Sequence, residues 1–181
     1  MTHVNLIDPA SSSAAVKPTL DKINGAFGVV PNMFRAVANS PAALSSMWGS
    51  FGALGGGTLG ARLGEEIAVA VANANSCEYC LAAHTALGRQ AGASKEDMTA
   101  AQVGKSSDPR TQAALTFALK LVRNRAAVTE ADVTALKTAG FDDEGIVEII
   151  AHVALNLFTN YINVALNVPV DFPAVPLKQA A

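Results

Sequence analysis

The chain of 181 residues is half hydrophobic and only 15% charged, with 13 lysines and arginines against 15 aspartates and glutamates. That apolar content excludes intrinsic disorder, and a net charge of −2 offers nucleic-acid phosphates no general attraction. The N-terminus lacks a basic start and an apolar run, and no stretch of roughly 18 residues stays apolar without interruption, so we expect neither a secretory signal nor a membrane span. We therefore expect a cytoplasmic globular protein that covers its excess apolar surface by forming a homo-oligomer.

Alanine is abundant and the apolar residues follow helical spacing, so the pattern predicts an all-α chain. Residues 11–30 are typical of an arm with a short helix at about 19–24. Pro31 and Pro41 predict helices over 32–38 and 41–54, because proline is favoured at helix starts. We expect this half to supply core residues, some of which shape an apolar pocket: Phe27, Met33, Phe34, Met47, Trp48 and Phe51.

The second part of the chain shows a cap or a stop signal at nearly every predicted helix end. Ser76 is the expected N-cap of the helix that carries the cysteines, and Gly92 ends it. The predicted helices here span 61–75, 77–90, a short segment after Ser94, 111–124, 130–139 and 143–167. We divide the chain into an N-terminal extension, residues 1–60, packed on a core of residues 61–181, the two forming one structural unit.

Both cysteines lie in one short segment, Cys77-Glu78-Tyr79-Cys80, and His84 follows four residues later. A Cys-x-x-Cys at a loop-to-helix junction brings two sulfurs within disulfide reach, and the first helical turn favours a thiolate at Cys77. His84 lies one turn after Cys80, so its imidazole can accept a thiol proton directly or through a water. In a chain that is not secreted, this pattern indicates redox chemistry rather than a structural disulfide.

Two other interpretations of the cysteines remain open. They could form half of a zinc site with His84 and His152, although structural zinc sites usually draw on a second ligand pair that the sequence lacks. They could also be inert core residues. Upstream, one of the two acids Glu65 and Glu66 could reach His84, or both could simply complement the dipole of their helix.

The last predicted helix is apolar nearly all round except for one stripe rich in asparagine. Asparagine is unfavourable inside helices, so its repetition indicates a sheltered hydrogen-bonding stripe, at a subunit interface or along the active-site cavity. The alternative is an ordinary exposed face. Within this stripe we expect His152 to be structural rather than catalytic, and we treat His152 and Asn156 as possible relay or pocket residues. Its members are Glu148, His152, Asn156, Thr159, Asn160, Asn163 and Asn167.

The order Glu65, Cys77-x-x-Cys80, His84 resembles the Glu-x11-Cys-x2-Cys-x3-His signature of the alkylhydroperoxidase D-like group in the carboxymuconolactone decarboxylase superfamily. Flanking segments such as 27–32 and 147–152 are also similar, so the resemblance covers nearly the whole chain. It implies an alkylhydroperoxidase D-like helical bundle with an N-terminal helical extension, assembled as a dimer, trimer or hexamer.

The resemblance also implies an antioxidant, thiol-dependent peroxidase with a redox-active disulfide and without a metal or an organic cofactor. Cys80 would attack the hydroperoxide, Cys77 would resolve the sulfenic acid, and His84 would be the base, linked through water to Glu65. Some family members have a second histidine in the relay where this chain has Tyr79, and a phenol is a poor proton acceptor near neutral pH. We therefore treat Tyr79, with Glu66, as a possible relay or pocket residue.

The residues of such a pair also indicate a reaction sequence. A thiolate attacks the peroxide, and a second thiol then forms a disulfide with the oxidised cysteine. A dithiol or a thioredoxin-like protein reduces the disulfide. Two alternative functions are a cofactor-free decarboxylase of the same superfamily, whose members generally lack the cysteine pair, and a disulfide-based redox sensor without rapid turnover.

Overall fold

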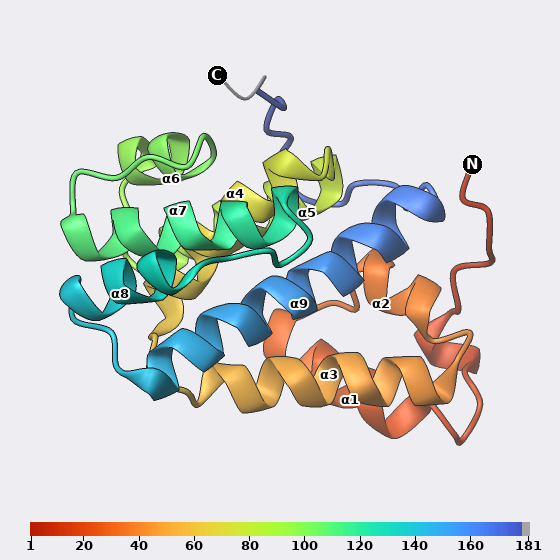
Figure 1. The fold of residues 1–181 in the computed structure, drawn as a ribbon. Helices are drawn as coiled ribbons and strands as arrows, with labels where there is room; N and C mark the ends of the chain where they lie inside the picture. Colours follow the sequence, from red (N-terminus) through yellow and green to blue (C-terminus); the bar gives the residue numbers. More distant parts are fainter. Residues whose placement is uncertain (179–181) are drawn as a thin grey trace.

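The computed structural model describes residues 1–178, and within them every regular element is a helix (Figure 1). The all-α prediction is therefore confirmed. A short 3-10 turn, Pro9–Ser11, precedes nine helices in this part of the chain: α1 Lys17–Phe27, α2 Asn32–Val37, α3 Pro41–Gly55, α4 Ala61–Ala74, α5 Glu78–Gln90, α6 Lys95–Ala101, α7 Pro109–Arg123, α8 Glu130–Thr138 and α9 Asp143–Ala165.

Local signals explain most helix ends. Side chains cap the first turns of several helices, as Ser40 does for α3 and Asp108 for α7, and Ser94 forms a capping box with Asp97 at α6. The helix α1 is longer than the predicted 19–24. Pro18 fits its first turn, and the helix continues until Gly28, whose φ of 75° is the left-handed conformation that glycine adopts at helix ends.

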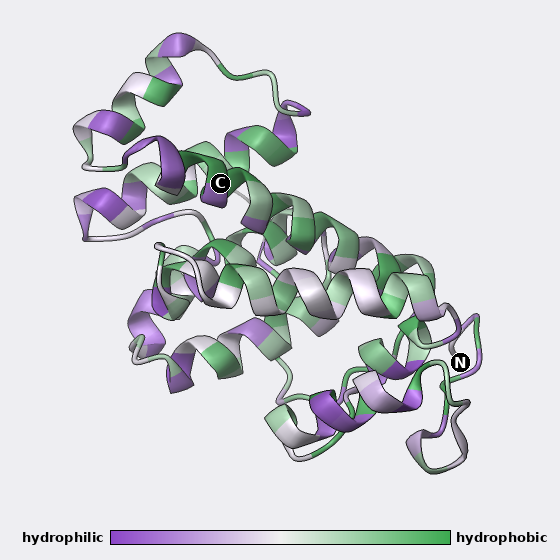
Figure 2. Cartoon of the chain, turned by 90° about the horizontal axis from the view of Figure 1, so that it is seen from below, coloured by the Kyte–Doolittle hydropathy of each residue, from purple (hydrophilic) through white to green (hydrophobic). Residues whose placement is uncertain are grey.

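The longest helix, α9, crosses the middle of the molecule in Figure 1 and contacts α2, α3, α4, α5, α7 and α8. On one side of it lie α1, α2 and α3, and on the other the helices α4 to α8. Helix α4 contacts α5, α6, α7 and α9, so the two helices together form the centre of the fold. Figure 2 shows hydrophobic residues concentrated in the central helices and hydrophilic residues at outer turns.

By length and composition alone, α9 would be able to cross a membrane, and it is the one such helix among residues 1–178. Its asparagines are nevertheless buried against other helices of the same chain. Core helices of globular proteins meet the same criterion, and the packing of α9 is of that kind.

Glu148 in the second turn of α9 holds the turn that follows α3. Its carboxylate accepts hydrogen bonds from the backbone N–H of Thr58 at 2.8 Å and of Leu59 at 3.1 Å. A Cβ atom on Gly57 would lie 2.5 Å from Glu148 Oε1, so only glycine lets the carboxylate approach this turn. The contact fixes the connection between the N-terminal helices and the core.

Candidate active site

A cavity of about 340 Å³ lies between the N-terminal helices and α5. Aromatic side chains form much of its wall, with Phe34 in edge-to-face contact with Trp48 and with Phe51. Five of the six residues expected in the core or pocket line this cavity, whereas Met47 is fully buried elsewhere in the core. The polar groups that reach it include Glu65, Tyr79, Cys80, His84 and Thr159.

The turn before α5 presents the two cysteines. Cys77, not the expected Ser76, is the N-cap of α5, because its Sγ accepts a hydrogen bond from the backbone N–H of Cys80 at 3.2 Å. Ser76 instead adopts a positive φ of 56° that turns the chain from α4 into α5. Both cysteines are buried thiols without a disulfide.

Glu65 on α4 is the acid that reaches His84. Its Oε2 lies 2.7 Å from His84 Nδ1, and Glu65 and His84 both line the cavity. The two helices approach closely at Gly88, where a Cβ atom would lie 3.3 Å from the Cβ of Glu65. Burial opposes a charge on His84, but the Glu65 carboxylate outweighs it and raises the pKa of His84.

The pKa values of the two cysteines are shifted in opposite directions. Burial alone would raise the pKa of Cys80, but hydrogen bonding from the Cys77 thiol, the charge on His84 and hydrogen bonding from Asn163 lower it. The hydrogen bond to Cys80, together with burial, raises the pKa of Cys77 far above its usual range. The expectation of a thiolate at Cys77 is therefore wrong: backbone N–H groups at the helix start do lower the pKa of Cys77, but the hydrogen bond to Cys80 and burial outweigh them, so Cys77 keeps its proton.

Asn163 on α9 is a site residue that the sequence did not single out beyond its place in the asparagine stripe. Its Nδ2 donates a hydrogen bond to Cys80 Sγ at 3.1 Å, and the side chain is 3% exposed. The neighbouring Asn160, fully buried, accepts a hydrogen bond from Asn75 and also lowers the pKa of Cys80. The exposed-face alternative is thus wrong for the centre of the stripe, which is buried, and two of its members, Asn160 and Asn163, lie beside Cys80.

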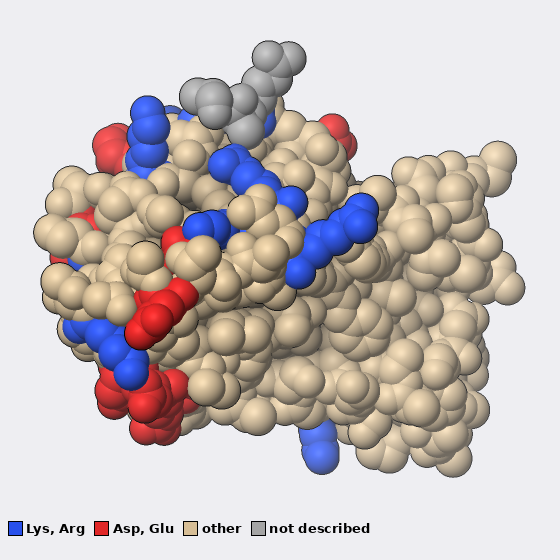
Figure 3. Space-filling view, viewed as in Figure 1, with Lys and Arg blue, Asp and Glu red and all other residues tan. Residues whose placement is uncertain are grey.

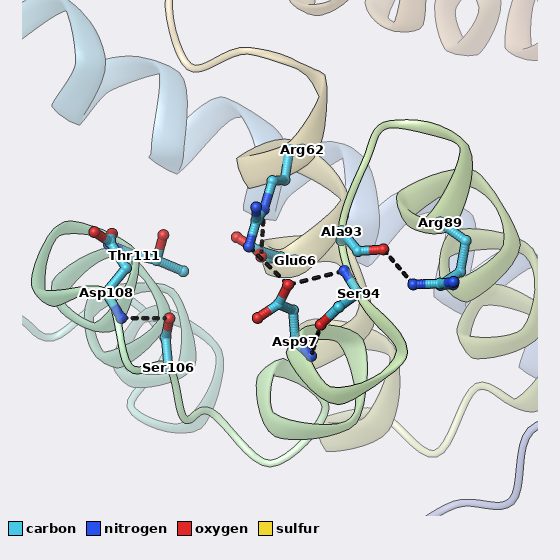
Figure 4. A network of polar contacts seen from close by, with 9 residues as sticks. All are labelled: Arg62, Glu66, Arg89, Ala93, Ser94, Asp97, Ser106, Asp108 and Thr111. Carbon is cyan, nitrogen blue, oxygen red and sulfur yellow. Dashed lines mark hydrogen bonds and ion pairs between the residues drawn. The ribbon is translucent and has the colours of Figure 1, made fainter.

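Three of the possible relay or pocket residues lie outside the cavity. Glu66 is buried on another face of α4, where it pairs with Arg62 at 3.1 Å, and Arg62 also contacts Asp97 at 2.9 Å (Figure 4). His152 packs against the backbone of α4, with its Cε1 atom 3.1 Å from where a Cβ of Gly64 would be. Asn156 is buried and donates to the backbone oxygen of His152 at 2.9 Å. Helical spacing places residues on a face, but neighbouring helices decide what that face meets.

Tyr79 lines the cavity, and its hydroxyl and its ring both make contacts that hold the cavity wall. Its hydroxyl accepts a hydrogen bond from the backbone N–H of Met33 at 3.2 Å, and its ring contacts Phe172 edge to face. Burial raises the pKa of Tyr79 well above its usual range, so the phenol keeps its proton. Phe172, from the segment after α9, completes the cavity wall, and no periodic sequence signal marks it because it follows the last helix.

No group of three or more His, Cys, Asp or Glu side chains lies together as metal ligands within residues 1–178. His152 in particular lies against α4 and does not line the cavity with Cys80 and His84. The zinc alternative therefore gains no support from the geometry of the described side chains.

Comparison with protein families agrees with this geometry. Residues 41–123 match the profile of the carboxymuconolactone decarboxylase family, and this range contains Glu65, both cysteines and His84. Over this range the chain is similar to that family. No curated protein is significantly similar to it in sequence.

Solved structures give the same classification over nearly the whole chain. A peroxidase-related protein from Silicibacter sp. TM1040 is 28% identical with a TM-score of 0.82, covering 93% of this chain and 91% of that one. A peroxidase-related protein with an alkylhydroperoxidase AhpD core, from Ralstonia eutropha JMP134, is 28% identical with a TM-score of 0.84 and covers 94% and 92%. The debrominase Bmp8 shares the fold at 21% identity, with a TM-score of 0.78 and 94% of each chain covered. This chain therefore has the alkylhydroperoxidase D-like helical fold and resembles peroxidase-related proteins.

Proposed function

We propose that this protein is a thiol-dependent peroxidase that reduces hydroperoxides through Cys80 and Cys77. The observation that carries the proposal is the position of the Cys80 sulfur: it lies at an apolar cavity, accepts a hydrogen bond from Asn163 and has a lowered pKa. A thiolate is the nucleophilic form of cysteine, and a partly accessible thiolate beside a second thiol is the arrangement that peroxide chemistry needs.

The reaction follows from the groups in place. The Cys80 thiolate attacks the distal oxygen of ROOH, the O–O bond breaks, and Cys80 becomes a sulfenic acid while RO⁻ departs. His84, held by Glu65, is the available acid that protonates RO⁻ to the alcohol. The Cys77 thiol then attacks the sulfenic sulfur, so that a disulfide forms and one water leaves. Two electrons and two protons from an external thiol reductant restore both cysteines.

The cavity wall indicates the class of peroxide. Aromatic and aliphatic side chains dominate it, and such a wall favours the apolar part of an organic hydroperoxide over hydrogen peroxide. A dithiol or thioredoxin-like reductant and a cytoplasmic location, where thiols stay reduced, complete the proposal.

The decisive experiment counts thiols under denaturing conditions before and after one equivalent of cumene hydroperoxide. The wild-type protein is expected to lose both of its two thiols. Cys77→Ser is expected to lose its remaining thiol to a sulfenic acid that dimedone traps, whereas Cys80→Ser is expected to keep the Cys77 thiol. Loss of the Cys77 thiol in Cys80→Ser at the wild-type rate would contradict the assigned roles.

Turnover with dithiothreitol separates the enzyme from a redox sensor. A peroxidase consumes many equivalents of peroxide per chain, and both serine variants are expected to lose this turnover. A single oxidation event without turnover in the wild type would favour the sensor. Decarboxylation of a muconolactone-type substrate, followed by ultraviolet absorbance, would favour the decarboxylase, especially if both serine variants retained it.

A further inference from the structure

The two cysteines open onto different hollows of the molecule. Cys80 lines the apolar cavity described above, which we call the Cys80 cavity. Cys77 lines a second pocket of about 180 Å³, the Cys77 pocket, formed by the start of α5, the end of α9 and residues 168 and 170. Among the described residues, neither cysteine lines the other's hollow, and Tyr79 lines both and separates them.

The walls of the two hollows differ in character. The Cys80 cavity is largely aromatic, whereas the Cys77 pocket carries Ser76, Glu78, Asn163 and Asn167. The Nδ2 of Asn163 donates its hydrogen bond to Cys80 Sγ, while the buried Oδ1 of the same side chain has no hydrogen-bond partner within residues 1–178. A buried acceptor without a partner costs about 1–3 kcal/mol of stability, so its retention beside a reactive thiol indicates a ligand or a water there.

We propose that the Cys77 pocket admits the thiol that reduces the Cys77–Cys80 disulfide, so that peroxide and reductant reach the pair from different sides. This proposal rests on the proposed function. The reductant thiolate attacks Cys77 Sγ, the Cys77–Cys80 bond breaks, and a mixed disulfide forms at Cys77 while Cys80 leaves as the thiolate. A second reductant thiol then releases Cys77, which takes up a proton, and the reductant leaves as its disulfide.

Attack at Cys77 agrees with the environment of each sulfur. The better leaving thiolate is the one whose charge is stabilised, and Cys80 has the Asn163 amide and the cationic His84 beside it. Attack at Cys80 from the aromatic cavity would expel a thiolate at Cys77, where burial opposes the charge. The electronic preference and the geometry of access therefore point to the same sulfur.

The charge of the Cys77 pocket selects among reductants. Glu78 is exposed at its rim, and no lysine or arginine belongs to its described lining. A carboxylate at the rim repels a thiol that carries a second negative charge and attracts one that carries a positive charge. We infer that uncharged or cationic small thiols reduce the enzyme faster than anionic ones.

The first experiment fills the Cys77 pocket from its rim with Val170→Trp. The matched control is Val29→Trp, another exposed valine, which lines neither hollow. The proteins are oxidised to the disulfide with diamide, independently of peroxide, and reduction by 2-mercaptoethanol is followed by stopped-flow tryptophan fluorescence or by quenched thiol counts. We expect Val170→Trp to be reduced at least about tenfold more slowly than wild type and Val29→Trp to match wild type, because access limits thiol exchange.

The second experiment reverses the rim charge with Glu78→Lys. Its control, Glu130→Lys, makes the same change at the first residue of α8, as Glu78 is the first residue of α5. Three thiols of equal chain length probe the pocket: 2-mercaptoethanesulfonate, 2-mercaptoethanol and cysteamine. We expect Glu78→Lys to raise the ratio of the anionic to the cationic rate constant by about fivefold or more, and Glu130→Lys to leave it unchanged.

The outcomes separate the two proposals. If Val170→Trp slows reduction by thiols but slows oxidation by peroxide much less, access from two sides is supported. If reduction is unaffected, or if it is slowed as much as oxidation, the Cys77 pocket is not the reductant site. If wild type forms its disulfide with diamide but not with peroxide, the proposed peroxidase function fails, and the same two experiments still decide the side of thiol access.

Discussion

Asn163 shows how one buried amide distinguishes two neighbouring sulfurs. Cys77 and Cys80 are separated by two residues at the start of the same helix, and both are almost fully buried. The difference is that Cys80 accepts from an amide on α9 and faces the charge of His84, whereas Cys77 donates to Cys80. The hydrogen bonds of each sulfur therefore shift the two pKa values in opposite directions, which is why we propose Cys80 as the nucleophile.

The pH dependence of the first step follows from this asymmetry. The pKa of Cys80 is lowered to about 7. The rate of oxidation of the reduced protein by peroxide is therefore expected to rise with pH through the neutral range and to level off above it, because the thiolate is then fully formed. Thiolate absorbance at 240 nm should follow the same curve in Cys77→Ser, which retains only Cys80. A rate that kept rising above about pH 9 would indicate an unperturbed thiol as nucleophile.

Replacing the amide tests its contribution directly. Asn163→Leu keeps the approximate size and removes the donor, and a hydrogen bond to a charged group contributes about 1.5–3 kcal/mol, so we expect at least about tenfold less thiolate below neutral pH. The titration at 240 nm and the pH profile of peroxide oxidation both measure this. Asn156→Leu is the control, because Asn156 donates to its own helix and has a buried Oδ1 without a partner in the described chain. If the two variants titrated alike, Asn163 would not stabilise the thiolate.

At the scale of elements, α3 and α5 form opposite walls of the Cys80 cavity, and α4 supplies Glu65 behind α5. Small residues set these distances. Gly88 lets α5 approach Glu65 on α4, and Gly64 lets His152 of α9 pack against α4. Gly52 of α3 lines the cavity and has no atom within 4 Å of where its Cβ would be, so the space there is open. The glycine in α3 thus leaves part of the cavity open.

If a larger side chain at position 52 fills the open part of the Cys80 cavity, we expect the preference among peroxides to change while the protein still folds. In Gly52→Leu the cavity is narrowed, and we expect the rate with cumene hydroperoxide to fall at least about tenfold relative to that with hydrogen peroxide. Leucine is the better helix former by about 0.8 kcal/mol, so thermal unfolding should show equal or higher stability. The control is Gly49→Leu, since Gly49 also lies in α3 with open space around its Cβ and does not line the cavity. Equal loss with both peroxides would place the organic substrate elsewhere.

At the scale of the whole molecule, charge and apolar surface are unevenly distributed. On the face seen in Figure 3, charged side chains gather over α6, α7 and α8, whereas the part formed by the N-terminal segments and the end of α9 carries almost none. Val147, Ile150 and Tyr161 are exposed along α9, with Tyr161 63% exposed. Such a contiguous apolar face on a single chain is typical of a surface that another copy covers.

We therefore expect the protein to form a homo-oligomer through the exposed face of α9. Sedimentation should give a mass well above the 18.6 kDa of one chain. The double variant Ile150→Glu and Tyr161→Glu should sediment as a monomer, because burying two carboxylates in the contact would cost several kcal/mol. The control is Val29→Glu, because Val29 is an exposed apolar residue outside α9. A monomeric wild type would show that this face is not an interface between copies.

Local signals in the sequence are enough to predict the helices and the cysteine motif. Caps, prolines and glycines act within a few residues, so the helices from α2 to α9 could be predicted within a few residues, and α1 was missed only in length. The pair Cys77 and Cys80, with His84 one turn on, is a local pattern that requires no knowledge of the fold. The asparagine stripe likewise predicted that α9 has a sheltered face.

The contacts that each of these groups makes depend on how the helices pack. It assigned Glu65 to His84 and Glu66 to Arg62, because adjacent residues on α4 face different neighbouring helices. It brought Asn163 to Cys80, 83 positions away in the chain, and placed Phe172 in the cavity wall. Contacts between residues far apart in sequence arise from the packing of whole helices, and the pKa of a buried thiol depends on those contacts. For this reason, the sequence indicated a reactive cysteine pair, whereas the packing of α4, α5 and α9 carries our proposals that Cys80 is the nucleophile and that each cysteine is reached from its own side.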